Sequence, residues 1–355
     1  MAMMWSGLDL ARGLYEEVVG PALTVPHTAC LIGEGSEVIG FDTDRSTDHE
    51  WGPRLQVLVG EEAIASTRMV VEETLPDTFR GLPTRWFSLA AGQITNHIDV
   101  DTTERWLAQH LPTLPADPDL AHWLAAPQQH LLQLTAGQVF RDDLGVLTHR
   151  RQTYAWYPDD LWRWLLASQW HLIGNTEPLL GRTIDSGDRR GARLLTARLC
   201  QLVMEMAYLQ QRRYQPYPKW IGAGFQRLPP ARVLGPLLDV ALDQEPTLRP
   251  DGPLQQALLV LATGHNALEL SVPVEATITD FTVGVNDAVR PFPVLNTPAF
   301  IDATVTSITD PALAKLPRVG ALDQLTHGDD QLINFTSWPA ELAASYRQML
   351  TTAAT

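Results

Sequence analysis

The stretch GSEVIGFDTDRSTDHEWG, residues Gly35–Gly52, decides how this sequence is interpreted. Its first two residues, Gly35 and Ser36, close the apolar segment CLIGEGS, and Asp48 and Glu50 follow near its end. Side chains alternate between the faces of an extended strand, so Asp48 and Glu50 are predicted to share one face, roughly 6.6–7 Å apart. Two carboxylates in this arrangement favour a hard cation such as Mg²⁺, which prefers oxygen ligands and often keeps substrate phosphates as co-ligands.

This pattern resembles the nucleotidyltransferase superfamily related to DNA polymerase beta. Its members share a Gly-Ser turn, a connecting segment, an Asp-x-Asp/Glu pair on a strand and a third carboxylate on a later strand. Here Thr47 stands where many members have Ser, and Glu50 stands where Asp is more usual. The segments YLQQRRYQPYPKW (208–220) and VRPFPV (289–294) look like a bacterial branch of two-domain proteins known only as nucleotidyltransferase-like.

The resemblance implies a third carboxylate on a strand of the form apolar-acid-apolar. The segment Ile98–Val100, with Asp99 at its centre, has this form, and Asp101 is the runner-up on the same strand face. Clustered carboxylates raise one another's pKa unless a cation neutralises them. The resemblance therefore implies two Mg²⁺ ions held by Asp48, Glu50 and Asp99, about 3.5–4 Å apart. Asp99 would also draw the proton from the attacking hydroxyl.

The triphosphate of a nucleotide is expected at the Gly-Ser turn. Gly35 lets the backbone come close to the phosphates, and the exposed amides and the Ser36 hydroxyl can donate hydrogen bonds to them. Thr47 is assigned to the same nucleotide-binding group. Lys219 is the preferred cation for the triphosphate, with an ordinary surface lysine as the alternative. Arg54, just beyond the acidic pair, is expected either to pair with a site carboxylate or to meet phosphate.

The amino-acid composition indicates which kinds of molecule the protein can bind. The chain has 355 residues, 26 basic against 41 acidic, and a net charge of −15. This balance opposes broad binding of a nucleic-acid backbone, which depends on neutralising many phosphates, and favours a small substrate. No run approaches the twenty or so apolar residues that a membrane span requires. No secretory signal is recognisable, and Cys30 and Cys200 are too few for a disulfide framework, so a cytoplasmic location is expected.

The order of predicted elements indicates an α+β protein. Residues 7–20 read as a helix, and residues 95–111 read as a strand passing into a helix with Thr102 or Thr103 at its N-cap. From about residue 119 the apolar spacing is helical throughout. We therefore predict an N-terminal nucleotidyltransferase α/β domain with a mixed sheet, followed by a mainly helical bundle.

The domain boundary is placed in the proline-rich segment LPTLPADPDL (111–120). The predicted domains are residues 1–115, carrying the catalytic groups, and residues 116–355, closing over the nucleotide. In the second domain, Trp162, Trp164 and Trp170 are expected to be core rather than a stacking platform for a base.

The expected reaction is Mg²⁺-dependent transfer of a nucleoside monophosphate, AMP from ATP or that of another NTP, to a hydroxyl of a small molecule, with release of pyrophosphate. The architecture is similar to that of aminoglycoside adenylyltransferases. One alternative is a toxin-type enzyme that modifies tRNA or a protein. Another is a non-catalytic nucleotide-binding interaction protein.

Overall fold

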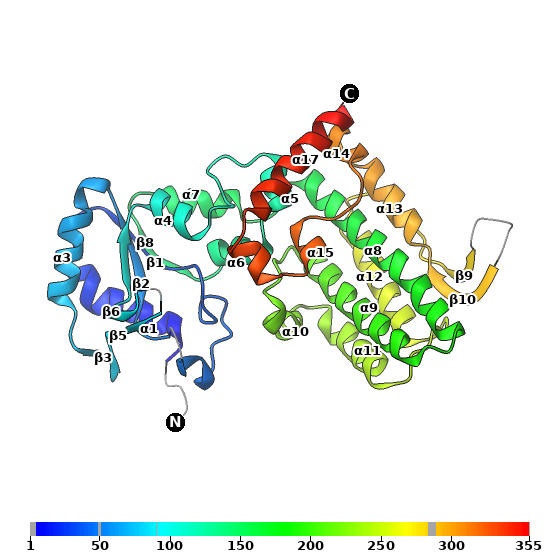
Figure 1. Cartoon of the computed structure of the whole chain (residues 1–355), viewed down its shortest axis with the longest axis horizontal. Helices are drawn as coiled ribbons and strands as arrows, with labels where there is room; N and C mark the ends of the chain where they lie inside the picture. Colours follow the sequence, from blue (N-terminus) through cyan, green and yellow to red (C-terminus); the bar gives the residue numbers. More distant parts are fainter. Residues whose placement is uncertain (1–4, 49–50, 90, 283–288, 355) are drawn as a thin grey trace. The chain divides into compact units, whose positions relative to one another are not determined.

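The computed structural model describes residues 5–48, 51–89, 91–282 and 289–354 (Figure 1). It confirms the α+β class, with a mixed sheet in the N-terminal part of the chain and helices in the C-terminal part. Among the described helices, none is both long and apolar enough to cross a membrane.

The chain divides into two compact units. Unit 1 comprises Met1–Pro118 and Ala126–Ala155, and unit 2 comprises Asp119–Ala125 and Trp156–Thr355. This division differs from the predicted boundary after residue 115, because a strand from the Ala126–Ala155 segment pairs with the first strand of the sheet. Strand pairing across more than a hundred residues leaves no local pattern in the sequence.

Unit 1 is built on a four-stranded sheet. In spatial order its strands are β7 (Ile98–Asp101), β2 (Leu55–Val59), β1 (His27–Leu31) and β8 (Gln138–Asp142). Strand β1 runs antiparallel to β2 and to β8, whereas β2 and β7 are parallel. The mixed sheet predicted from the sequence is therefore present.

Helices and short hairpins complete unit 1. They are α1 (Gly7–Leu14), η1 (Tyr15–Val19), α2 (Gly20–Ala22), η2 (Asp44–Asp48), η3 (Glu61–Ala63), α3 (Ile64–Thr74), α4 (Thr103–His110), α6 (Gln128–Thr135), α7 (Val146–Thr153), β3 (Thr78–Phe79), β4 (Leu82–Pro83), β5 (Arg85–Ser88) and β6 (Gln93–Asn96). Leu10, Leu14 and Val71 pack with the buried valines and leucines of one sheet face. Thr102 caps α4 by accepting a hydrogen bond from Arg105 N at 3.2 Å, which confirms one of the two predicted N-caps.

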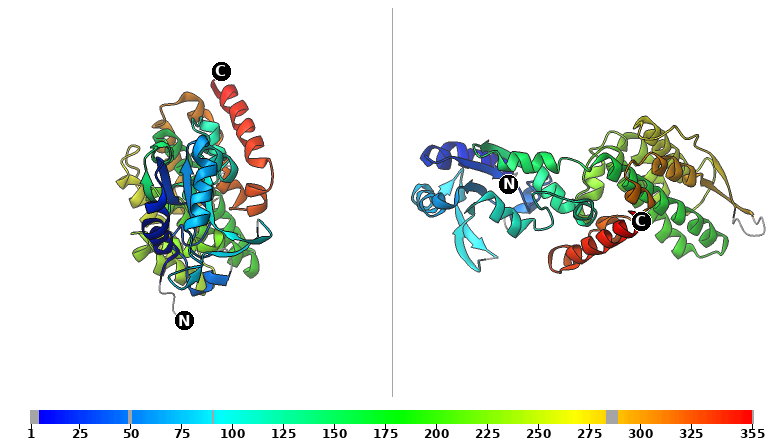
Figure 2. Two further views of the ribbon diagram at one scale, coloured as in Figure 1. Left: turned by 90° about the vertical axis from the view of Figure 1, so that its left-hand side faces the viewer. Right: turned by 90° about the horizontal axis from the view of Figure 1, so that it is seen from above.

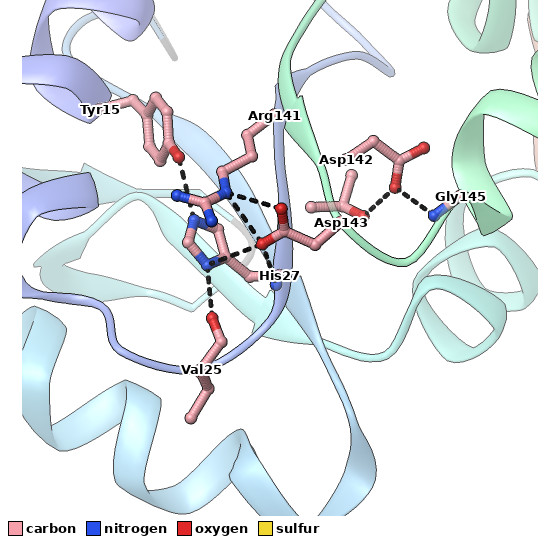
Figure 3. A network of polar contacts seen from close by, with 8 residues as sticks. Tyr15, Val25, His27, Arg141, Asp142, Asp143 and Gly145 are labelled. Carbon is pink, nitrogen blue, oxygen red and sulfur yellow. Dashed lines mark hydrogen bonds and ion pairs between the residues drawn. The ribbon is translucent and has the colours of Figure 1, made fainter.

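A polar network ties η1 to the sheet (Figure 3). His27 and Tyr15 are its buried members, whereas Arg141 and Asp143 are exposed. The Nδ1 atom of His27 lies 2.8 Å from the carbonyl of Val25, which can only accept, so Nδ1 carries the proton. In the neutral ring, Nε2 then accepts from the hydroxyl of Tyr15 at 3.0 Å. Asp143 accepts from His27 N at 3.2 Å and from Arg141 Nε at 2.8 Å. Because His27 is fully buried and Tyr15 nearly so, the contact between these two side chains holds the fold together rather than facing a substrate.

Unit 2 is almost entirely helical. Its elements are α5 (Leu120–Ala125), α8 (Asp159–Asp185), α9 (Arg189–Gln210), η4 (Pro218–Trp220), α10 (Ile221–Phe225), α11 (Ala231–Asp243), α12 (Pro253–Ala267), β9 (Ile278–Thr282), β10 (Val289–Leu295), α13 (Thr297–Thr306), α14 (Pro311–Lys315), α15 (Leu322–Thr326), α16 (Asp330–Asn334) and α17 (Trp338–Ala354). The long helices α8 and α9 lie side by side (Figures 1 and 2).

Helix α8 forms the centre of unit 2. Trp162, Trp164 and Trp170 are essentially fully buried, as predicted for core residues. Two glycines on α8 allow close packing: a Cβ atom on Gly174 would collide with Thr297 of α13, and one on Gly181 would collide with Phe292 of β10. The helix is therefore in contact with elements that follow it by more than a hundred residues.

Candidate active site

The Gly-Ser turn follows β1 after a connecting segment of residues 32–34. Gly35 has a φ of +121°, a region that favours glycine, and a Cβ atom there would collide with the side chains of Arg54 and Glu37. Phe41 N donates to the carbonyl of Ser36 at 2.8 Å, so the chain turns back immediately after Ser36. The conformation of the turn thus depends on glycine at position 35.

The segment between β1 and the turn is fixed from both neighbouring sides. Ile32 N donates to Gln56 Oε1 of β2 at 3.0 Å, and Gly33 N donates to the carbonyl of Gln133 in α6 at 2.9 Å. Gln56 is buried, so its side chain serves this backbone and does not face solvent. The turn is held on a rigid support.

A hydroxyl pair connects the turn to the acidic segment. Ser36 Oγ donates to Ser46 Oγ at 3.2 Å, and Ser46 Oγ accepts from Thr43 N at 3.0 Å. Ser46 belongs to η2 (Asp44–Asp48), and Asp48 is the last residue of this helix. Two segments that the sequence predicts to act together are therefore in direct contact.

The predicted strand through Asp48 is not present. Asp48 ends the 3₁₀ helix η2, and β2 begins only at Leu55. Ser, Thr and Asp side chains offer the backbone local hydrogen bonds that favour turns, and Thr47 Oγ1 donates to the carbonyl of Asp44 at 2.8 Å. The side chain of Asp48 and the whole of Glu50 lie outside the described residues, so their predicted role as metal ligands stays a prediction.

The residues just after the acidic pair are anchored. Trp51 Nε1 donates to Asp42 Oδ2 at 3.3 Å, and the same oxygen accepts from Gly7 N of α1 at 2.8 Å. Asp42 is thus half-buried and accepts hydrogen bonds from both neighbours. Gly52 is buried against Trp86 of β5, whose ring would lie 2.9 Å from a Cβ atom at that position. The chain is held on both sides of the pair, by Ser46 before it and by these contacts after it.

Arg54 pairs with a carboxylate that is not among the predicted site residues, and its two predicted roles, pairing with a site carboxylate or meeting phosphate, stay predictions. Its Nε donates to Glu37 Oε1 at 2.7 Å, and its guanidinium also reaches the carbonyl of Glu34. Glu37 is 3% exposed and Arg54 18% exposed, so the pair is shielded from water. Sequence analysis missed Glu37, although a charged residue directly after a Gly-Ser pair is a signal that could have drawn attention to it.

Asp99 and Asp101 lie on the same face of β7 but differ in their contacts. Asp101 is 15% exposed, pairs with Arg105 Nη1 at 3.1 Å and accepts from Thr102 N at 2.7 Å. Asp99 is exposed and accepts a hydrogen bond from Trp106 Nε1 at 3.2 Å. The contacts of Asp101 fix the start of α4, whereas Asp99 keeps an oxygen facing solvent. This contrast favours Asp99 as the third carboxylate.

Trp106 connects Asp99 to the segment that carries the Gly-Ser turn. Its indole lies 3.0 Å from the position that a Cβ atom on Gly33 would take, while its Nε1 bonds Asp99. Gly33 has a φ of +88°, and Trp106 is 3% exposed. One buried ring therefore separates Asp99 from the start of the turn. No local pattern predicted this contact, because a tryptophan on a helix is usually part of the core.

The Gly-Ser turn, the residues that follow the acidic pair and Asp99 lie at one end of the sheet. Cys30 pairs with Gln56, and Leu55 pairs with Ile98, so the end of β1 and the starts of β2 and β7 lie side by side. The Gly-Ser turn leaves β1 there, the acidic segment enters β2 there, and β7 carries Asp99 there. Among the side chains that the structure describes, no group of three His, Cys, Asp or Glu residues could hold a metal ion.

Lys219 belongs to unit 2. It lies in η4, is exposed, and its Nζ is 4.8 Å from the centroid of the Trp220 ring. The ammonium group thus contacts an aromatic ring while remaining in water. Its assignment to the triphosphate stays a prediction.

Comparison with known proteins gives one match. A family model described as a domain of unknown function (DUF4037) matches residues 123–221. The matched segment includes α6, β8, α7, α8, α9 and η4, and with them Lys219. The Gly-Ser turn, the acidic segment and Asp99 lie outside it. No curated protein and no solved structure matches the chain.

Proposed function

We propose that this protein is a nucleotidyltransferase that uses Mg²⁺ to move a nucleoside monophosphate from ATP or another NTP to a hydroxyl of a small acceptor. The observation that carries the proposal is the contact between the Gly-Ser turn and the acidic segment through Ser36 and Ser46 at 3.2 Å. A phosphate-binding turn beside carboxylates is the arrangement that metal-assisted phosphoryl chemistry needs, because the phosphates and the metal must share ligands.

In this proposal, the residues of the chain have the following roles. The backbone amides of the turn and the Ser36 hydroxyl bind the β- and γ-phosphates, and Asp48, Glu50 and Asp99 hold the cations. Mg²⁺, when bound, neutralises the carboxylates and the phosphate charge. The acceptor oxygen forms a bond to the α-phosphorus as the bond from that phosphorus to the bridging oxygen breaks, and pyrophosphate leaves with the electron pair. The hydroxyl proton passes to Asp99, whose exposed carboxylate can reach a substrate.

The charge of the chain supports a small acceptor. The chain has 41 acidic and 26 basic residues, and this excess of negative charge disfavours the binding of long polyanions such as tRNA. The position of Arg54 agrees with this interpretation, because its charge is already matched by Glu37 and is not offered to a nucleic-acid backbone.

Nucleotide binding tests the proposal directly. Isothermal titration of the full chain with α,β-methylene-ATP should show binding that requires Mg²⁺ and is lost in EDTA. Asp48→Asn should weaken binding in Mg²⁺, while the melting temperature stays unchanged or rises slightly because repulsion between carboxylates is relieved. Metal-independent binding, or none, would reject the proposal. Binding without pyrophosphate release from ATP in the presence of any acceptor would indicate a nucleotide-binding protein that does not catalyse transfer.

A further inference from the structure

Helix α11 of unit 2 has two apolar faces, of which one is covered and the other is exposed. The helix packs against α9 and α12, and Leu234 and Leu238 are buried. The side chains of Val233 and Val240 are 55% and 40% exposed, and Pro236 between them is exposed as well. Spacings of three and four residues align these last three side chains on one face of a helix. We call them the α11 stripe.

The surface beside the α11 stripe is open. A Cβ atom added at Gly235, next to Pro236 in the chain, would meet nothing within 4 Å. Figure 1 shows α11 at the margin of the helices of unit 2. A solvent-facing helix carries polar residues on its outer face when it has no further partner. Aligned apolar side chains on the outer face are instead typical of contact with a second helix.

Charged side chains follow one flank of the α11 stripe. Arg232 lies in the first turn of α11, and Asp239 and Asp243 lie in its second half. With 3.6 residues per turn, the three side chains fall within about 40° of one another around the helix axis, next to Pro236. Within the described part of the chain, no ion pair involves any of the three. Their charges are therefore available to another molecule.

The order of these charges does not stabilise α11 by itself. The helix dipole favours acidic side chains near the N-terminus of a helix and basic ones near its C-terminus. Arg232 and Asp243 have the opposite order, with the base at the start and the acid at the end. A neighbouring helix that runs in the opposite direction and carries the same charges would match this order.

From this arrangement we propose that α11 pairs antiparallel with α11 of a second copy of this chain. A two-fold axis near Pro236 brings Val233 of each copy against Val240 of the other, which covers the stripe on both. In an antiparallel pair the same flank of the two helices comes together. Arg232 of one copy then lies between Asp239 and Asp243 of the other, because the stripe pairing places it level with the residues between them. Each dimer contains this arrangement twice.

The dimer is expected to be reversible. Helix α11 has 13 residues and is therefore about 20 Å long. One helix of this length covers less than the roughly 800 Å² per partner of a standard interface, which is typical of a transient contact. The net charge of −15 opposes association, but salt at about 0.15 M screens charges more than roughly 8 Å apart. The inference does not depend on the proposed function.

Sedimentation equilibrium of the full chain in such salt measures the association. As the concentration rises, the weight-average mass should increase from that of the monomer toward that of the dimer. Val240→Lys introduces a charge into the α11 stripe of both copies and should raise the dissociation constant on the order of tenfold or more. Val272→Lys is the matched control and should leave the constant unchanged, because Val272 is 72% exposed and lies outside α11.

An exchange of charges tests the antiparallel direction. Arg232→Glu places like charges opposite one another in its own dimer, and so does the double variant Asp239→Arg/Asp243→Arg, so each should associate less than the wild type. In an equal mixture the two proteins should form a heterodimer, because every acidic flank then faces a basic one. Both variants keep a net negative charge, so general attraction between them does not explain a recovery.

Three outcomes would overturn the proposal. The first is a chain that stays monomeric at every concentration. The second is a dimer that Val240→Lys leaves intact and that Ile94→Lys disrupts, since Ile94 is 71% exposed in the β5–β6 hairpin and marks a different surface. The third is a mixture of the charge variants no heavier than its components. If a circular dichroism melting curve shows that Val240→Lys does not fold, the charge variants decide, because the side chains that they replace are exposed.

Discussion

Ser36 and Ser46 share a hydrogen bond of 3.2 Å between their hydroxyl oxygens, although ten residues separate them in the chain. Ser36 belongs to the turn proposed to bind phosphates, and Ser46 belongs to the helix that ends at Asp48. Because Ser46 also accepts from Thr43 N, its hydroxyl orients this helix with respect to the turn. The geometry of the candidate site therefore depends on two small polar side chains.

A double-mutant cycle measures this contact. Ser36→Ala and Ser46→Ala should each destabilise unit 1, and together they should cost less than the sum, with a coupling free energy of about 0.5–1.5 kcal/mol from urea unfolding. Ser66→Ala removes a hydroxyl that bonds only within its own helix region, so its effect should add to that of Ser46→Ala. Strict additivity for the Ser36 and Ser46 pair would mean that the contact contributes nothing in solution.

The two carboxylates of β7 should respond differently to neutralisation. Asp99→Asn keeps an oxygen that can accept from Trp106, so the melting temperature should hold while turnover falls by roughly 10²–10⁴-fold through loss of the general base. Asp101→Asn breaks the pair with Arg105 and should lower the melting temperature slightly with turnover within a few fold of the wild type. An assay of pyrophosphate release measures turnover, and a thermal melting curve measures stability, for each of the two variants. The reverse pattern would assign the third carboxylate to Asp101.

Gly35→Ala should be more damaging than an ordinary substitution at a positive φ. At Gly35 the new methyl group meets Arg54 and Glu37 in addition to the strained backbone, whereas at Gly81, with a φ of +82°, nothing lies within 4 Å. Gly81→Ala should cost about 1–2 kcal/mol from backbone strain alone. Gly35→Ala should cost about 1–3 kcal/mol more through overpacking, measured by urea unfolding. Equal losses would show that the Arg54–Glu37 pair moves aside freely.

Glu177 of α8 should give unit 2 a distinctive dependence on pH. Its side chain is fully buried, and burial raises its pKa from 4.5 to about 8, against the opposing effect of hydrogen bonds from Leu295 N at 3.2 Å and from Gln255. The folded state therefore holds this proton more tightly than the unfolded state. Its contribution to stability is complete below about pH 4.5 and is lost as the pH rises toward 8.

Glu177→Gln tests this dependence, because the amide keeps an acceptor for Leu295 N and cannot ionise. The free energy of unfolding of the variant relative to the wild type should increase between pH 5 and pH 9, by on the order of a few kcal/mol at the upper end. Glu275→Gln changes an exposed carboxylate in the same unit and should leave the slope of stability against pH unaltered over this range. Parallel curves for the wild type and Glu177→Gln would show that Glu177 is solvated.

Features with a local cause were predictable from the sequence. The helical spacing of Trp162 and Trp170 predicted buried core, and Thr102 was one of two predicted caps of α4; the structure confirms both. The strand through Asp99 was also predicted, because alternation of apolar and acidic residues is a property of neighbouring positions. The prediction of a strand through Asp48 was wrong. Hydrogen bonds of Ser and Thr side chains to nearby backbone groups favour a turn there instead.

The sequence by itself determined the α+β class, the order of the sheet and helical parts, and the residue types of the candidate site, because all three depend on composition and short-range spacing. Only the tertiary structure decided that β8 belongs to the first unit, that Glu37 holds Arg54, and that Trp106 joins Asp99 to the glycine segment. These contacts join positions far apart in the chain or require a turn that reverses its direction. Their energy comes from burial and hydrogen bonding in three dimensions, which no local pattern of residues encodes.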